Sequence, residues 1–160
     1  MNVKKLVGCM LALGMCAMAL TGCGQQASYR QVPVQELVQG IEGQVEFSML
    51  GDMDAEQAQI AYEGLPWEQV EAYAIRYAMM NVRVNELAVF VLKDQAHAQA
   101  VMDACRARAE QLAKQFEQYL PDQYAIAQNP LIAQYGTYVL FAIHEDTEAI
   151  RTQFESMIAQ

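Results

Sequence analysis

The N-terminus of the chain constrains the fold most strongly, because it holds a charge-free apolar run that is not patterned like a globular core. Met1 to Lys5 include two lysines, and the segment from Leu6 to Thr21 has no charged residue. This run is about 16 residues long, shorter than the ~20 residues that a membrane-spanning helix needs. A short positive start followed by such a run is typical of a secretory signal peptide. We therefore expect residues 1–22 to be removed.

The run ends in Leu20-Thr21-Gly22-Cys23. This resembles the lipobox of bacterial lipoproteins, in which an apolar residue and two small residues precede the cysteine that accepts diacylglycerol. The resemblance implies that Leu20, Thr21 and Gly22 are recognised by the signal peptidase and that Cys23 is the lipid attachment site. Two acyl chains hold a protein stably on a bilayer where one does not. The alternatives are a signal peptide cut elsewhere and an uncleaved signal anchor.

The charge of the chain excludes two classes of partner. Removal of residues 1–22 takes away Lys4 and Lys5 and leaves 8 basic against 19 acidic residues, a net charge of −11. Nucleic acid binding needs a basic surface, so we exclude it. Adhesion to anionic lipid headgroups needs positive charge as well, so only the lipid anchor would hold the protein on the membrane. We expect it on the extracytoplasmic face of the cell membrane.

The remaining cysteines give no disulfide framework. Only Cys23 and Cys105 lie beyond the apolar run, so a lipidated Cys23 would leave Cys105 as a buried free thiol. The expected organisation is a signal peptide over residues 1–22, the lipidated cysteine and a tether over 23–31, and a single globular domain over 32–160.

The apolar spacing of this domain predicts an α+β fold. Pro33 begins one short helix that ends at Gly43, and Asp54 with Gln57 forms the capping pair of a second helix that ends at Gly64. The later predicted elements are strands over 70–80 and 87–92, a helix from Asp94 to about Tyr119, a short helix over 122–128, strands over 131–134 and 137–143, and a helix from Asp146. The core stripe of the long helix is Ala98, Val101, Cys105, Ala109, Leu112, Phe116 and Tyr119. The order ββα-ββα predicts a two-layer sandwich, with two helices on one face of a four-stranded antiparallel sheet and the two N-terminal helices at an edge or end.

From about Val34 onward the chain resembles a family of uncharacterised lipoproteins from Gram-positive, largely clostridial, bacteria. The stretches that carry the resemblance are Met79 to Val89, Tyr119 to Tyr124 and Gly136 to Phe141. The family is known as a domain of unknown function without established catalytic residues. The resemblance therefore implies an extracytoplasmic location and one globular domain, but no activity.

No pattern of catalytic, metal-binding or cofactor-binding residues is evident. His97 and His144 are the only histidines and have no partner at ligand spacing, so we expect both on the solvated surface. The chain has no Gly-rich phosphate loop. The acidic residues near Gly51 lack the calcium-loop pattern, and helix capping explains Asp54 better.

The turn that joins the first two predicted strands into a β-hairpin is the candidate binding surface. Met79 and Met80, beside Asn81 and Arg83, could form an adaptable apolar contact surface with polar specificity. The alternative, which the sequence favours, is that Met79 or Met80 fills the core while Asn81 supports the turn. Arg83 and Glu86 would then pair across the hairpin.

We therefore expect a non-enzymatic binding or accessory module at the cell envelope, whose partner is an envelope protein, a peptide or a glycan. The alternative is an envelope enzyme, or a subunit of one, that uses carboxylates.

Overall fold

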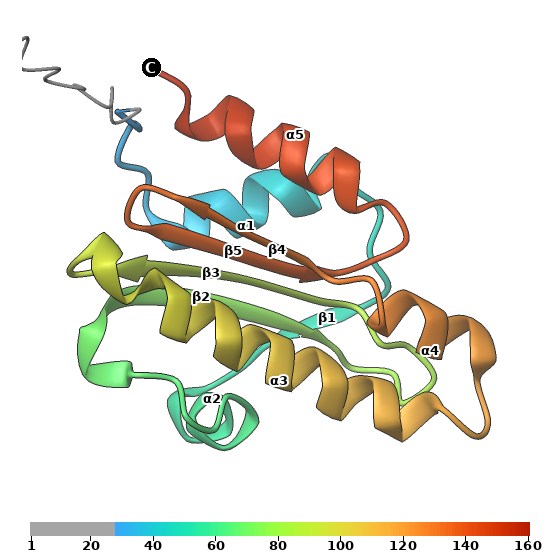
Figure 1. Ribbon diagram of the computed structural model, residues 1–160. Coiled ribbons are helices and arrows are strands. Elements are labelled where there is room, and N and C mark those ends of the chain that lie inside the picture. The colour runs from blue at the N-terminus through green and yellow to red at the C-terminus, as the bar shows by residue number, and fades with distance from the viewer. Residues whose placement is uncertain (1–27) are drawn as a thin grey trace, which may run out of the picture.

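The computed structural model describes residues 28–160, which form an α+β fold around one antiparallel sheet (Figure 1). The strand order is β1-β2-β3-β5-β4. In chain order the elements are α1 (Val34–Glu42), β1 (Leu50–Asp52), α2 (Ala55–Ala61), η1 (Trp67–Gln69), β2 (Val70–Ala78), β3 (Glu86–Leu92), η2 (Gln95–His97), α3 (Ala98–Phe116), α4 (Pro121–Ala127), β4 (Leu131–Tyr135), β5 (Tyr138–Ile143) and α5 (Thr147–Ile158).

Helices cover both faces of this sheet. Ala88 and Phe90 of β3 pack with α2, α3 and α4, whereas Leu87 and Val89 pack with α1 and α5. The α+β class and the antiparallel sheet are confirmed, but the two-layer, four-stranded arrangement is wrong. Strands β3 and β5 are apolar on both faces, so each face needs a covering layer. The fifth strand, β1, has only three residues and lacks the alternating pattern that reveals longer strands.

Local sequence signals place the start of α2 but not the end of α3. The Asp54 carboxylate accepts a hydrogen bond from the Gln57 backbone at 2.8 Å, and the Gln57 side chain accepts one from the Asp54 backbone at 3.1 Å, so the predicted capping box is confirmed. Helix α3 begins after a 3-10 turn and ends at Phe116. Tyr119 therefore lies beyond the helix and is exposed, and the core position predicted for it is wrong.

The N-terminal segment enters the fold at one end of the sheet. The Arg30 backbone N–H donates to the Ile158 carbonyl at the end of α5, and the Val32 backbone N–H donates to the Tyr138 hydroxyl at the start of β5. The β4–β5 turn lies at the same end, because a Cβ on Gly136 would contact the ring of Tyr29. We call this the proximal end.

The β2–β3 hairpin lies at the opposite, distal end. In the antiparallel register of β3 and β5, Val91 pairs with Tyr138 at the proximal end and Glu86 pairs with Ile143 at the distal end. At ~3.3 Å per residue, these strands separate the two ends by about 20 Å. Figure 1 shows the N-terminal segment and the β2–β3 connection at opposite ends of the strands. No helix within residues 28–160 is long and apolar enough to span a bilayer.

Candidate functional site

The distal end carries a patch of exposed apolar side chains. Met79, which follows β2, is 60% exposed, and Met49, which precedes β1, is 67% exposed. The two residues are paired, since the Met79 backbone N–H donates to the Met49 carbonyl at 3.0 Å. Met80 and Val82 are exposed on the adjoining loop. We call these four residues the hairpin surface. The core role that the sequence favoured for Met79 or Met80 is therefore wrong.

The loop itself is held from below by a buried side chain of α4. Gln123 accepts a hydrogen bond from the Val84 backbone at 3.0 Å and is almost completely buried. Asn81 and Arg83 lie on the exposed part of the loop before Val84. The hydrogen bond to Gln123 therefore fixes the loop next to its exposed residues. Sequence reasoning missed Gln123, because a single polar residue in a short helix gives no periodic signal.

A polar recess of about 350 Å³ adjoins the hairpin surface. Its lining is Glu46, Phe47, Ser48, Arg83, Asn85, His144 and Glu145. Ser48 directly precedes Met49, and Arg83 directly follows Val82, so recess and hairpin surface are continuous along two chain segments. The recess therefore adds hydrogen-bonding groups beside an apolar contact area.

Hydrogen bonds fix the geometry of this recess. The Ser48 hydroxyl donates to the Asn85 side-chain oxygen at 3.1 Å, and the Asn85 amide donates to the Glu145 carboxylate at 3.3 Å. The Arg83 guanidinium lies 3.9 Å from the Glu145 carboxylate. The predicted pairing of Arg83 with Glu86 is wrong, because Glu86 points into the core.

His144 is part of the recess wall and has no free ring nitrogen. Its Nδ1 accepts a hydrogen bond from the Asp146 backbone at 2.9 Å, so Nε2 donates to the Glu46 carbonyl at 3.0 Å. The side chain is buried, and the expectation of a solvated surface histidine is wrong for His144. His97 is half-buried at the end of η2, directly before α3. With both nitrogens of His144 engaged, its ring offers neither a general base nor a metal ligand.

A buried ion pair supports the base of the hairpin. Glu86, at the start of β3, binds Arg108 of α3 at 2.7 Å and accepts a hydrogen bond from the Tyr62 hydroxyl at 2.7 Å. Burial, reinforced by the charge of Glu86, raises the pKa of Tyr62 well above its usual range. Burial alone would lower the pKa of Arg108, but its hydrogen bonds and ion pair with Glu86 raise it. The cluster is satisfied internally, so its role is to join β3 to α2 and α3.

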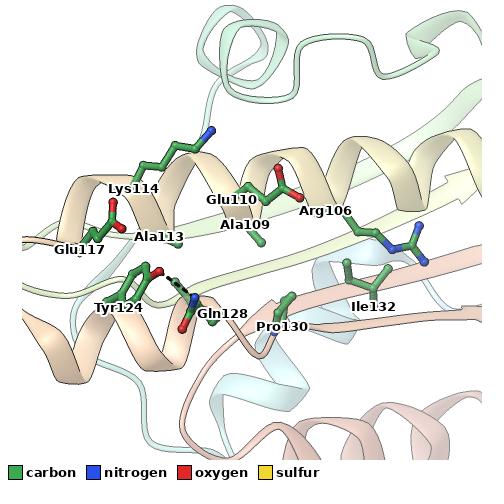
Figure 2. A pocket seen from close by; sticks show the side chains of 11 residues that line it. Arg106, Ala109, Glu110, Ala113, Lys114, Glu117, Tyr124, Gln128, Pro130 and Ile132 are labelled. Atoms are coloured by element: carbon green, nitrogen blue, oxygen red, sulfur yellow. Dashed lines mark hydrogen bonds between the residues drawn. The ribbon is translucent and has the colours of Figure 1, made fainter.

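A second, larger cavity of about 680 Å³ lies between α3, α4 and β4 (Figure 2). Ala109 and Ala113 line it on the α3 side, and the Gln128 amide donates to the Tyr124 hydroxyl at 2.8 Å across from them. Figure 2 shows Lys114 extending away from Tyr124 and Gln128. The charged residues that line this groove are exposed on α3 or directly after it, so none of them is fixed by burial to orient a ligand.

The remaining sequence candidates are placed as follows. Cys105 is a buried free thiol, as predicted, and burial raises its pKa. Cys23 and the segment Leu20 to Gly22 lie outside the described residues. Within residues 28–160 there is no group of three or more His, Cys, Asp or Glu residues that could hold a metal ion.

Comparison with known proteins identifies the family but no activity. The model of the family Domain of unknown function (DUF4358) matches residues 44–144, a segment that holds all five strands, the hairpin surface and His144. No curated protein and no solved structure matches the chain. The match confirms the predicted membership of a family of unknown function, and the chain belongs to the DUF4358 family.

Proposed function

We propose that this protein is a lipid-anchored binding module on the outer face of the cell membrane, held through Cys23 and contacting a protein partner through the hairpin surface. The main support for this proposal is that the chain enters the fold at the end opposite to the hairpin surface. The described chain enters the fold at the proximal end, and the exposed methionines lie at the distal end. An anchor at Cys23 would therefore direct the hairpin surface away from the membrane.

The anchor is supported by sequence and charge. Leu20-Thr21-Gly22-Cys23 fits the lipobox, and an acidic protein cannot adhere to anionic lipid by charge. Contacts with the body of the fold already begin at Ser28, whose hydroxyl donates to the Gln160 side chain at 2.6 Å. Five residues reach at most about 18 Å, so lipidation at Cys23 would keep the proximal end close to the bilayer.

The binding role is supported by the chemistry of the distal end. Exposed apolar side chains that gather beside polar groups mark interaction sites on soluble domains. Methionine suits such a surface because its flexible thioether adapts to different partners. We propose binding in preference to catalysis, since both nitrogens of His144 are engaged and Glu86 is neutralised by Arg108.

Metabolic labelling tests the anchor. Cells that express the full chain are fed a palmitate analogue, and labelling is compared between the wild type and Cys23→Ala. We expect Cys23→Ala to lose the label. Equal labelling of both proteins would rule out the anchor.

Site-specific photo-crosslinking tests the binding surface. A photoreactive amino acid replaces Val82 at the distal end or, as a matched control, the exposed Ser156 at the proximal end. We expect a discrete cross-linked species in intact cells with Val82 replaced and none with Ser156 replaced. The same species at both positions, or none at Val82, would contradict the proposal.

A further inference from the structure

Strand β1 forms one edge of the sheet and leaves hydrogen-bonding groups free. Gly51 pairs with Tyr77, and the neighbouring bonds from the Met79 N–H to the Met49 carbonyl and from the Met53 N–H to the Ile75 carbonyl follow the same register. Odd-numbered residues of this segment therefore bond to β2. In an antiparallel ladder the alternate residues point their N–H and C=O groups the other way.

The outward groups belong to Leu50 and Asp52. Within residues 28–160, no backbone hydrogen bond outside regular helices and strands involves these two residues. Such an edge is a template on which another strand can pair. This edge is accessible to a partner, because Asp52 is exposed and the neighbouring Met49 is largely in solvent.

The hairpin surface extends along this edge. A Cβ on Gly51 would lie 3.1 Å from the Met79 sulfur, so the Met79 side chain lies across Gly51. Met49, directly before β1, is hydrogen-bonded through its carbonyl to the N–H of Met79, directly after β2. A strand that pairs with β1 would therefore place its side chains on one face against methionine.

The surroundings of β1 are acidic. Residues 31–75 contain nine acidic residues and no lysine or arginine. Arg76, which follows, is already bound to Glu42 and Asp52 at 2.6 Å. The exposed Glu46 and Glu56 lie before and after β1 on the same chain segment. Charge complementarity therefore favours a positive partner and disfavours an anionic membrane.

We propose that the partner docks as an extended, positively charged polypeptide segment that pairs with β1 and adds a strand to the sheet. This deepens the proposed function and rests on it. Main-chain hydrogen bonds to Leu50 and Asp52 hold the segment, apolar side chains on one face contact Met49 and Met79, and lysine or arginine side chains face the acidic residues. Because β1 is short, we expect binding to be weak. Because the charges that attract the segment are exposed, we expect binding to weaken as the salt concentration rises.

The probe is a fluorescent, end-blocked peptide of alternating lysine and valine, titrated against the full chain in detergent. A peptide with glutamate in place of lysine is the charge control. We expect saturable binding of the lysine peptide, about tenfold weaker binding of the glutamate peptide, and amide shifts at Leu50 and Asp52 in nuclear magnetic resonance spectra.

Two variants of Asp52 separate edge pairing from charge. Asp52→Ala loses the carboxylate but keeps the outward N–H, whereas Asp52→Pro loses both and places a ring on the edge. We expect Asp52→Ala to bind within about threefold of the wild type and Asp52→Pro at least about tenfold more weakly. If Asp52→Pro does not fold, the lysine peptide with N-methylated backbone amides serves instead, because it keeps the charge but cannot donate main-chain hydrogen bonds to the edge, and the same tenfold loss is expected.

Several results would overturn the inference. These are equal binding by Asp52→Pro and Asp52→Ala, equal binding of the two peptides, and binding of the full chain to anionic vesicles through Met49 and Met79. A homodimer that Asp52→Pro abolishes, without peptide binding, would assign the edge to a second copy of the chain. A cross-link at Val82 without peptide binding would leave the proposed function standing and refute only the pairing with β1.

Discussion

Replacement of Arg108 by methionine should destabilise the fold far more than the same replacement of Arg106 on the same helix. Glu86 is 1% exposed and Arg108 is 12% exposed at the side chain, whereas Arg106 is 50% exposed and pairs with Asp103. Arg108→Met would leave the Glu86 carboxylate buried with only the Tyr62 hydroxyl as partner. Removal of one member of a buried ion pair costs about 3–5 kcal/mol, whereas an exposed pair contributes about 0–1 kcal/mol.

The assay is urea and thermal unfolding of the full chain, followed by circular dichroism. For a domain of this size, a loss of about 3–5 kcal/mol lowers Tm by about 10–20 °C. The double variant Glu86→Gln with Arg108→Met should recover part of this loss, because a neutral amide is cheaper to bury and can still accept from Tyr62. If Arg108→Met and Arg106→Met unfold within about 1 kcal/mol of each other, the ion pair does not have the assigned role.

Three further predictions concern side chains and turns elsewhere in the fold. Burial raises the pKa of Tyr135 to about 12 and that of Tyr62 well above its usual range. The stability that these two neutral hydroxyls contribute is therefore intact below about pH 10 and is lost as the pH rises through the raised pKa values. An absorbance titration should show two tyrosines that ionise late, and simultaneous titration of all tyrosines would contradict this. Burial also raises the pKa of the Cys105 thiol, so a maleimide at pH 8 should modify it only after unfolding, and rapid labelling of the native protein would refute its burial. Gly64 and Gly136 have φ of 82° and 59°, so alanine at either position should lower the free energy of unfolding by about 1 kcal/mol, measured in thermal melts. The loss of stability should be larger at Gly136, where a Cβ would lie 3.1 Å from the Tyr29 ring. Unchanged stability in both variants would contradict the turn geometry.

The sequence predicted local structure well because the relevant signals are local. Asp54 and Gln57 are three residues apart, and the buried stripe from Ala98 to Phe116 repeats with each helical turn. The predictions of the capping box and of this stripe are therefore confirmed. Strand β1 was missed, because three residues that include Gly51 and Asp52 carry no alternation. The two-layer sandwich was wrong even though β3 is apolar on both faces, and that pattern already required helices on both sides.

The candidate site was only partly predictable, because its character depends on tertiary contacts. Methionine is compatible with core and surface alike, so Met79 and Met80 could not be placed from the sequence. The partner of Glu86 is Arg108, 22 residues away on another element, and no local spacing points to it. A glutamate that opens an otherwise apolar strand was the available signal that Glu86 would need a buried cation.

The central claim is that the lipid anchor and the binding surface lie at opposite ends of the protein, and depth-dependent fluorescence quenching tests it most directly. Full-length Val82→Cys and Ser156→Cys are labelled with a fluorophore and reconstituted into vesicles that contain nitroxide-labelled lipid. Buried Cys105 leaves the introduced thiol as the reactive one in the described fold. The label at position 156 should be strongly quenched and the label at position 82 only weakly. Equal or stronger quenching at position 82 would place the exposed methionines in the membrane and contradict the claim.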